Sequence, residues 1–141
     1  TLMAAVVPAM RSSKVADRSV VHLSSTAGHR ALARYGAYCA SKAAVERLTE
    51  QQALELARDR IRVNCVAPGL TPTDMIDGTL ERAAQHAHMT RSDIEAQVLR
   101  SIPMRRFAEP SDIADAVVFL AGRRSAYITG QVVTVDGGMS L

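Results

Sequence analysis

The strongest constraint on the fold is the order strand, long helix, strand in the first half of the chain. Residues 19–23 and 61–66 are short and mainly apolar, and residues 36–58 carry apolar side chains at helical spacing. Neither short segment alternates strictly between apolar and polar residues, which is typical of parallel strands covered on both faces. The order predicts a βαβ unit with parallel strands and a right-handed crossover.

Further elements extend this pattern. Thr90 and Asp93 have the spacing of a capping box and predict a helix that runs to residue 99. Other elements are expected at residues 1–10 (the end of a helix), 110–121 (a helix) and 132–135 (a third strand). The expected fold class is α/β, a single domain over residues 1–141 with three parallel strands and flanking helices. The polar, alanine-rich residues 71–103 are expected to lie outside the core.

Composition excludes several classes of protein. The chain has 141 residues, 48% of them apolar, which is enough for one folded domain with a buried core. No apolar run approaches the about 20 residues of a membrane-spanning helix, and no signal-peptide pattern opens the chain, so we expect a cytoplasmic protein outside the membrane. The net charge of +3 comes from scattered arginines, so nucleic acid is not an expected partner.

The sequence predicts no metal site. Cys39 and Cys65 have neither metal-ligand nor redox spacing and are expected to be free thiols in a helix and a strand. His86 and His88 are two residues apart, which would direct them to different faces of a helix.

Three residues carry the chemistry that the sequence suggests. Tyr38 and Lys42 are four residues apart on the expected helix, which places both side chains on one face. A phenol has an unperturbed pKa of about 10, and an adjacent ammonium favours its anion. Tyr38 is thus a candidate general acid toward a carbonyl, or general base toward an alcohol. Ser25 follows the first strand at the carboxyl end, where parallel sheets bind ligands, and can hold the substrate oxygen.

A Tyr–Lys pair at this spacing is common on helix surfaces, so the pair alone does not establish catalysis. Together with other motifs, however, the chain resembles the short-chain dehydrogenase/reductase family. The resemblance lies in VHLSSTAG (21–28), YCASK (38–42), RVNCVAPG (62–69), ITGQ (128–131) and DGG (136–138). These motifs occur in the family's order and span nearly the whole chain outside residues 71–103.

The resemblance implies a C-terminal portion of a Rossmann-like doubly wound sheet and assigns roles to individual residues. It implies a catalytic Ser25, with Ser24 as the alternative, together with Tyr38 and Lys42. It also implies contacts to an NAD or NADP cofactor from Tyr38, Lys42, Pro68, Gly69, Thr71 and Thr73. Asn64 matches a position that braces the strand beside the site. Residues 71–103 match the family's substrate-binding region and are expected to form a lid.

Two parts of the family's site have no counterpart in the chain. No glycine-rich turn that would bind a pyrophosphate occurs, and the asparagine of the family's proton relay would precede residue 1. Three strands alone would leave the strand at residue 20 with an unpaired apolar edge. We therefore expect the chain to belong to a longer protein and to be active only with the missing N-terminal, nucleotide-binding half.

The expected activity is reversible hydride transfer between a nicotinamide cofactor and a secondary alcohol or ketone. The long insert favours a small polar substrate such as a polyol, sugar or hydroxy acid. Reduction of a 3-oxoacyl-acyl-carrier-protein is the alternative within the enzyme class, and a non-catalytic fragment or interaction module is the alternative outside it. The family resemblance also implies a homodimer or homotetramer.

Overall fold

A three-stranded parallel sheet forms the centre of the computed structural model, which describes residues 2–141 apart from the side chain of Met75. Its strands are β1 (Arg18–Leu23), β2 (Ile61–Pro68) and β3 (Val132–Val135), in the order β1-β2-β3. The predicted α/β class and the predicted parallel pairing are confirmed. Position 1 of the helix expected at residues 1–10 lies outside the described residues.

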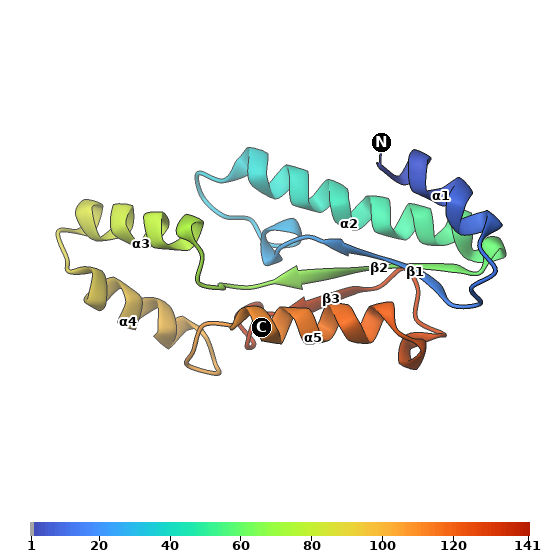
Figure 1. Ribbon diagram of the computed structural model, residues 1–141. Coiled ribbons are helices and arrows are strands. Elements are labelled where there is room, and N and C mark those ends of the chain that lie inside the picture. Colours follow the sequence, from blue (N-terminus) through green and yellow to red (C-terminus); the bar gives the residue numbers. More distant parts are fainter. Residues whose placement is uncertain (1) are drawn as a thin grey trace.

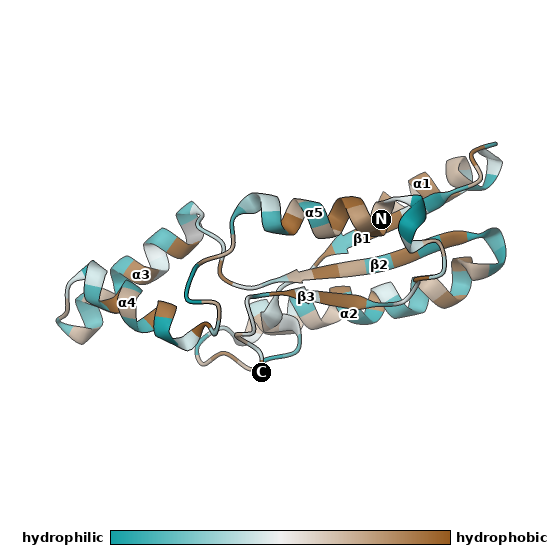
Figure 2. Cartoon of the chain, turned by 90° about the horizontal axis from the view of Figure 1, so that it is seen from below, coloured by the Kyte–Doolittle hydropathy of each residue, from teal (hydrophilic) through white to brown (hydrophobic). Residues whose placement is uncertain are grey.

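Helices cover both faces of the sheet (Figure 1). The helices α1 (Leu2–Ser12) and α2 (Gly36–Leu56) lie on one face, and α5 (Pro110–Ala121) lies on the other. Figure 2 shows that hydrophobic segments concentrate in β2, β3 and α5. The doubly covered sheet explains why the strand sequences lack strict apolar–polar alternation. No helix within residues 2–141 combines the length and the apolar character needed to cross a membrane.

The side chains of β2 divide between the two layers. Ile61 and Val63 join a core cluster with Ala53 and Leu56 of α2, against which residues of α1 pack. Asn64 points to the other face, where its amide donates to the Ile128 carbonyl at 2.9 Å. Seven of the eight residues of β2 are buried, so this strand anchors both layers.

The face of α2 that packs on the sheet differs from the one predicted. Of the apolar residues that predict this helix, only Leu56 is buried, and Leu48 and Leu54 are 47% and 81% exposed; the others are Ala40, Ala43 and Ala44. The remaining buried residues of the helix are Thr49 and Ala53. Counting back from Thr49 by helical steps reaches Lys42 and Tyr38, both half-buried. The sheet-facing row of α2 therefore contains the two predicted site residues.

Residues 71–103 form a two-helix unit beyond the carboxyl ends of β1 and β2 (Figure 1). It consists of α3 (Asp74–Ala87) and α4 (Arg91–Ser101), and α4 begins with the predicted Thr90–Asp93 capping box. The unit has a small core of its own, separate from the sheet, which is formed by Leu80, Ala84 and Ile94. The segment is outside the main core, as its composition predicts, but it has an apolar interior.

Short 3₁₀ turns connect these elements. They are η1 (Thr26–Gly28) after β1, η2 (Ala57–Asp59) between α2 and β2, and η3 (Arg123–Ser125) between α5 and β3. One edge of β1 has no strand partner within residues 2–141, which is the edge that the sequence predicts to be unpaired.

Candidate active site

The segment after β1 places Ser25 at the carboxyl end of the sheet. Ser25 has an extended backbone, and its Oγ caps η1 by accepting a hydrogen bond from the Ala27 N–H at 3.2 Å. This contact uses an oxygen lone pair and leaves the hydroxyl proton available to another acceptor. Ser25 is therefore positioned to donate a hydrogen bond at the end of β1.

The first turns of α2 bring Tyr38 and Lys42 to the same end of the sheet. The Lys42 Nζ lies 5.8 Å from the centroid of the Tyr38 ring. It also donates to the carbonyl oxygen of Leu23, the last residue of β1, at 3.2 Å. Tyr35 packs edge-on against Tyr38, with 6.5 Å between the ring centroids. The phenol and the ammonium are thus neighbours, and the ammonium is bound to the strand that leads to Ser25.

A buried network connects the serine segment to α2. The Ser24 hydroxyl lies 3.1 Å from the Lys42 carbonyl oxygen and 3.0 Å from Glu46 Oε1, and His29 Nδ1 lies 3.2 Å from the same Glu46 oxygen. A Cβ on Gly28 would lie 2.3 Å from that oxygen, so a larger residue there would displace the Glu46 carboxylate from this network. Ser24 is 4% exposed and engaged with α2, so Ser25 is the more accessible of the two serines. Glu46 is a member of this network that no sequence motif indicates.

Four predicted cofactor residues lie at the carboxyl end of β2 or shortly after it: Pro68, Gly69, Thr71 and Thr73. The Gly69 N–H donates to the Val135 carbonyl at 2.9 Å. A Cβ on Gly69 would lie 2.6 Å from the Asp136 Cβ, so this close approach requires glycine. Thr73 caps α3, with its Oγ1 3.5 Å from the Ile76 N–H.

One buried hydroxyl in this segment has an unused capacity for hydrogen bonding. The Thr71 Oγ1 is buried and has no hydrogen-bond partner within residues 2–141. Buried polar atoms are normally paired, so an orphaned hydroxyl at the end of a parallel strand fits a position that contacts a bound group. The segment from Pro68 to Thr73 is therefore compatible with a nicotinamide cofactor.

The turn after β3, which contains Asp136, lies directly against Gly69. The Asp136 carboxylate accepts hydrogen bonds from the Gly138 N–H at 2.9 Å and the Ser140 N–H at 2.8 Å. Burial raises the pKa of Asp136, but the hydrogen bonds from Ser140 and Gly138 outweigh it, so the pKa lies below its ordinary value. This carboxylate stays ionised and holds the turn in place.

Two titratable groups behind the site, Cys65 and His22, have pKa values that are shifted by burial. Burial raises the pKa of the Cys65 thiol, which disfavours the reactive thiolate. Burial also lowers the pKa of His22, whose Nδ1 lies 2.9 Å from the Thr49 Oγ1. Both cysteines are free thiols. Among the described residues, no three His, Cys, Asp or Glu side chains form a group that could hold a metal ion.

Comparison with known proteins places this site in a family. A family model described as enoyl-(acyl carrier protein) reductase matches residues 1–140. The chain is 42% identical over 123 residues to carbonyl reductase family member 4 of Danio rerio, covering 87% of this chain and 45% of the relative. It is 40% identical over 134 residues to a 3-oxoacyl-[acyl-carrier-protein] reductase of Thermotoga maritima, covering 95% and 49%. The chain belongs to the short-chain dehydrogenase/reductase family.

Solved structures agree with this assignment. The aldohexose dehydrogenase of Thermoplasma acidophilum superposes with a TM-score of 0.84 at 31% identity, covering 98% of this chain and 53% of that one. The chain thus spans about half the length of the relatives that it matches. The match confirms the Rossmann-like fold expected from the sequence motifs. The names of these relatives describe different substrates, so the family defines a class of oxidoreductases and not one reaction.

Proposed function

We propose that this chain carries the proton-transfer part of an NAD(P)-dependent oxidoreductase that interconverts a secondary alcohol and a ketone. One observation carries the proposal: the Lys42 ammonium lies 5.8 Å from the Tyr38 ring centroid while it donates to the carbonyl of Leu23. Through these two interactions of Lys42, the phenol, the ammonium and the Ser25 segment lie together at the carboxyl end of the sheet. This is the end at which α/β folds bind ligands.

Each residue has a defined task in this proposal. The Ser25 hydroxyl donates to the substrate oxygen and orients it. Tyr38 donates a proton to that oxygen when a ketone is reduced and removes it when an alcohol is oxidised. Lys42 favours the phenolate by its charge and binds the ribose of the cofactor. A bound nicotinamide supplies or accepts the hydride.

The cofactor contacts proposed for this chain are Tyr38, Lys42, Pro68, Gly69, Thr71 and Thr73. The orphaned Thr71 hydroxyl and the glycine-dependent approach of Gly69 to Asp136 support this assignment. Both NAD and NADP are compatible with these residues, because none of them contacts the part of the cofactor that distinguishes the two.

For the substrate, we propose a small polar alcohol or ketone, such as a polyol, sugar or hydroxy acid. Residues 71–103 then act as the lid, since α3 and α4 extend beyond the carboxyl ends of β1 and β2 (Figure 1). The likeness to an aldohexose dehydrogenase supports this class. A second candidate is 3-oxoacyl-acyl-carrier-protein reduction, which the 40% identity to the Thermotoga maritima enzyme favours. Assays of the full-length protein with polyols and with acyl thioesters separate the two.

The full-length protein is proposed to be a homodimer or homotetramer. The outward face of α2 supports this, because Leu48 and Leu54 are exposed there. Sedimentation of the full-length protein measures its mass in solution, and a monomer would contradict this part of the proposal.

The test of the mechanism is Tyr38→Phe in the full-length protein. We expect kcat to fall by about 10²–10⁴-fold, because the variant removes positioned proton transfer and little else. Tyr35→Phe is the matched control, since this ring packs on Tyr38 but is not the neighbour of Lys42 in the structure. Near wild-type turnover of Tyr38→Phe would refute the mechanism. Failure of the full-length protein to bind either nicotinamide cofactor would favour the non-catalytic alternative.

A further inference from the structure

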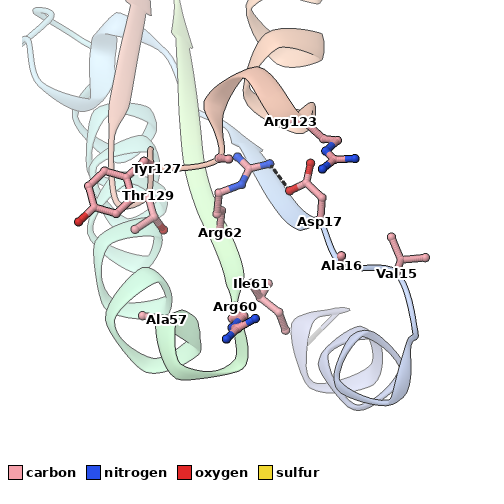
Figure 3. Close-up of a pocket in the computed structure, with 11 residues that line it drawn as sticks. Val15, Ala16, Asp17, Ala57, Arg60, Ile61, Arg62, Arg123, Tyr127 and Thr129 are labelled. Carbon is pink, nitrogen blue, oxygen red and sulfur yellow. Dashed lines mark hydrogen bonds and ion pairs between the residues drawn. The ribbon is translucent and has the colours of Figure 1, made fainter.

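A cavity lies at the amino ends of the strands, opposite the end that carries Ser25, Tyr38 and Lys42. Its volume is about 860 Å³. Three loops line it: the one before β1, the one between α2 and β2, and the one between α5 and β3 (Figure 3). The cavity is thus separated from the proposed active site by the length of β2.

Positive charge dominates the lining of this cavity. Arg60, Arg62 and Arg123 line it together with a single carboxylate, that of Asp17. Asp17 is already engaged, because its Oδ1 lies 3.1 Å from an Arg62 guanidinium nitrogen. Neither Arg60 nor Arg123 has a side-chain partner within residues 2–141. Two positive charges therefore remain without a counter-charge in the wall.

Arg62 forms the floor of the cavity. Its side chain is 9% exposed, and it donates to the Leu120 carbonyl at 2.7 Å and to the Ser125 Oγ at 2.9 Å. Its Nε is buried without a hydrogen-bond partner among the described residues. Because this atom has almost no accessible surface, Arg62 contributes positive charge to the wall rather than a free donor.

The two uncompensated arginines are held on short, ordered turns. Arg60 ends η2 with a left-handed backbone (φ 55°), a conformation in which glycine is less strained than any residue with a side chain. Arg123 begins η3, which Ser125 anchors by a hydrogen bond to the Leu120 carbonyl at 2.9 Å. In Figure 3 Arg123 lies near the Arg62 guanidinium and Asp17, and Arg60 lies next to Ile61 at the start of β2. The charges are therefore presented by fixed turns rather than by a mobile tail.

Apolar side chains make up much of the remaining wall. Val15, Ala57 and the fully exposed Tyr127 supply this part of the lining, whereas Ile61 is 1% exposed and belongs to the main core. Such a wall fits the body of an organic molecule better than a hydrated inorganic ion. We propose that this cavity binds a small organic oxyanion, with its phosphate or carboxylate held by Arg60 and Arg123 and its apolar part against Ala57 and Tyr127.

The test measures binding of phenyl phosphate to the full-length protein by titration calorimetry, with potassium chloride holding the ionic strength constant. We expect saturable binding to one site per chain. Arg60→Gln and Arg123→Gln are each expected to weaken it about tenfold, because each removes a charge-assisted contact. The matched controls Arg58→Gln and Arg124→Gln remove the same charge from adjacent exposed residues outside the cavity and are expected to change the affinity less than twofold.

A second variant separates binding from folding. Arg60→Gly removes the side chain and suits the left-handed backbone, so we expect weaker binding with an unchanged or higher Tm. Benzoate tests a carboxylate head group, and inorganic phosphate tests the head group alone. Equal weakening by all four glutamine variants, absence of saturable binding to phenyl phosphate and benzoate, or equally tight binding of inorganic phosphate would each overturn the proposal.

This site is independent of the proposed catalytic function. Tyr38→Phe is expected to leave the affinity for phenyl phosphate unchanged, since Tyr38 lies at the other end of the sheet. Loss of binding in that variant would place the ligand at the active site and overturn the assignment to this cavity.

Discussion

The carboxyl end of the sheet and the α3–α4 unit are stabilised in different ways. Tyr38 and Lys42 lie on a helix whose next turns pack on β2, where seven of eight residues are buried, and Lys42 is bound to the backbone of β1. The α3–α4 unit has a small core of its own and is linked across its surface by an ion pair between Arg91 and Asp77. Exposed ion pairs contribute little to stability. The small core therefore provides most of the stability of the α3–α4 unit.

Under the proposed function, this difference separates the residues that transfer the proton from the unit that selects the substrate. Proton transfer depends on fixed geometry, and the proposed proton-transfer residues are attached to the most buried part of the molecule. A unit with its own core can change its sequence or its position without disturbing β2. This is the arrangement expected if relatives with one mechanism act on different substrates.

The largest expected effect comes from parallel core truncations in the two regions. Ile61→Ala in β2 is expected to lower the free energy of unfolding of the full-length protein by about 2–5 kcal/mol, because Ile61 is 1% exposed in the main core. Ile94→Ala removes the same atoms from the α3–α4 core. It is expected to reduce hydrogen-exchange protection within α3 and α4 and to leave the sheet protected.

Chemical denaturation and hydrogen exchange measure both effects. Equal loss of protection throughout the chain in Ile94→Ala would show that the two regions unfold together, and the comparison would then fail.

The stability of the sheet region is expected to depend on pH through His22, in contrast to that of the α3–α4 unit. Burial lowers the pKa of His22 from its ordinary value of 6.5, so the folded protein favours the neutral imidazole. The unfolded chain binds this proton more readily, so the contribution to stability is complete above pH 6.5 and is lost as the pH falls below it. We expect Tm to decrease between pH 7.5 and 5.5, and to decrease less in His22→Asn.

The control for this effect is His86→Asn, which changes an exposed histidine of α3. It should keep the wild-type dependence of Tm on pH. The same loss of pH dependence in both variants would contradict a specific role of His22.

The smallest effect is expected where the α3–α4 unit connects to α5. Hydrogen bonds from Arg106, at 2.6 and 3.0 Å, together with one from the Glu109 N–H, lower the pKa of Asp112 to about 2. The contribution of this carboxylate to stability is present above its ordinary pKa of 3.8 and is lost as the pH falls through about 2. In Arg106→Gln, carboxyl NMR signals should titrate closer to pH 3.8. An unchanged midpoint would show that Arg106 is not the cause.

Local patterns predicted most of the fold. The strand–helix–strand order, the third strand and the Thr90–Asp93 capping box all depend on residues that are close in sequence, and the structure contains each of them. The buried face of α2 was predicted wrongly because its outward face is rich in alanine and leucine. Its sheet-facing row includes the polar residue Thr49. The Thr49 hydroxyl can be buried there because it is hydrogen-bonded to the Val45 carbonyl and to His22.

Contacts between distant residues could not be predicted in this way. Ser25, Tyr38 and Lys42 were identified by chemistry and family motifs, and the structure adds the bond between Lys42 and Leu23. Glu46 gave no signal, because a single glutamate on a helix is ordinarily a solvated residue. The arginine-lined cavity arises from three loops far apart in the chain, and only the fold brings them together.

The central claim is that the positive charge of Lys42 supports proton transfer by Tyr38. The most direct test is the pH dependence of kcat/KM for alcohol oxidation in the full-length protein, compared between wild type and Lys42→Gln. With the ammonium removed, we expect the rising limb of the profile to move to higher pH and the maximum rate to fall. A lower rate with an unmoved limb would assign Lys42 to cofactor binding alone and would contradict the claim.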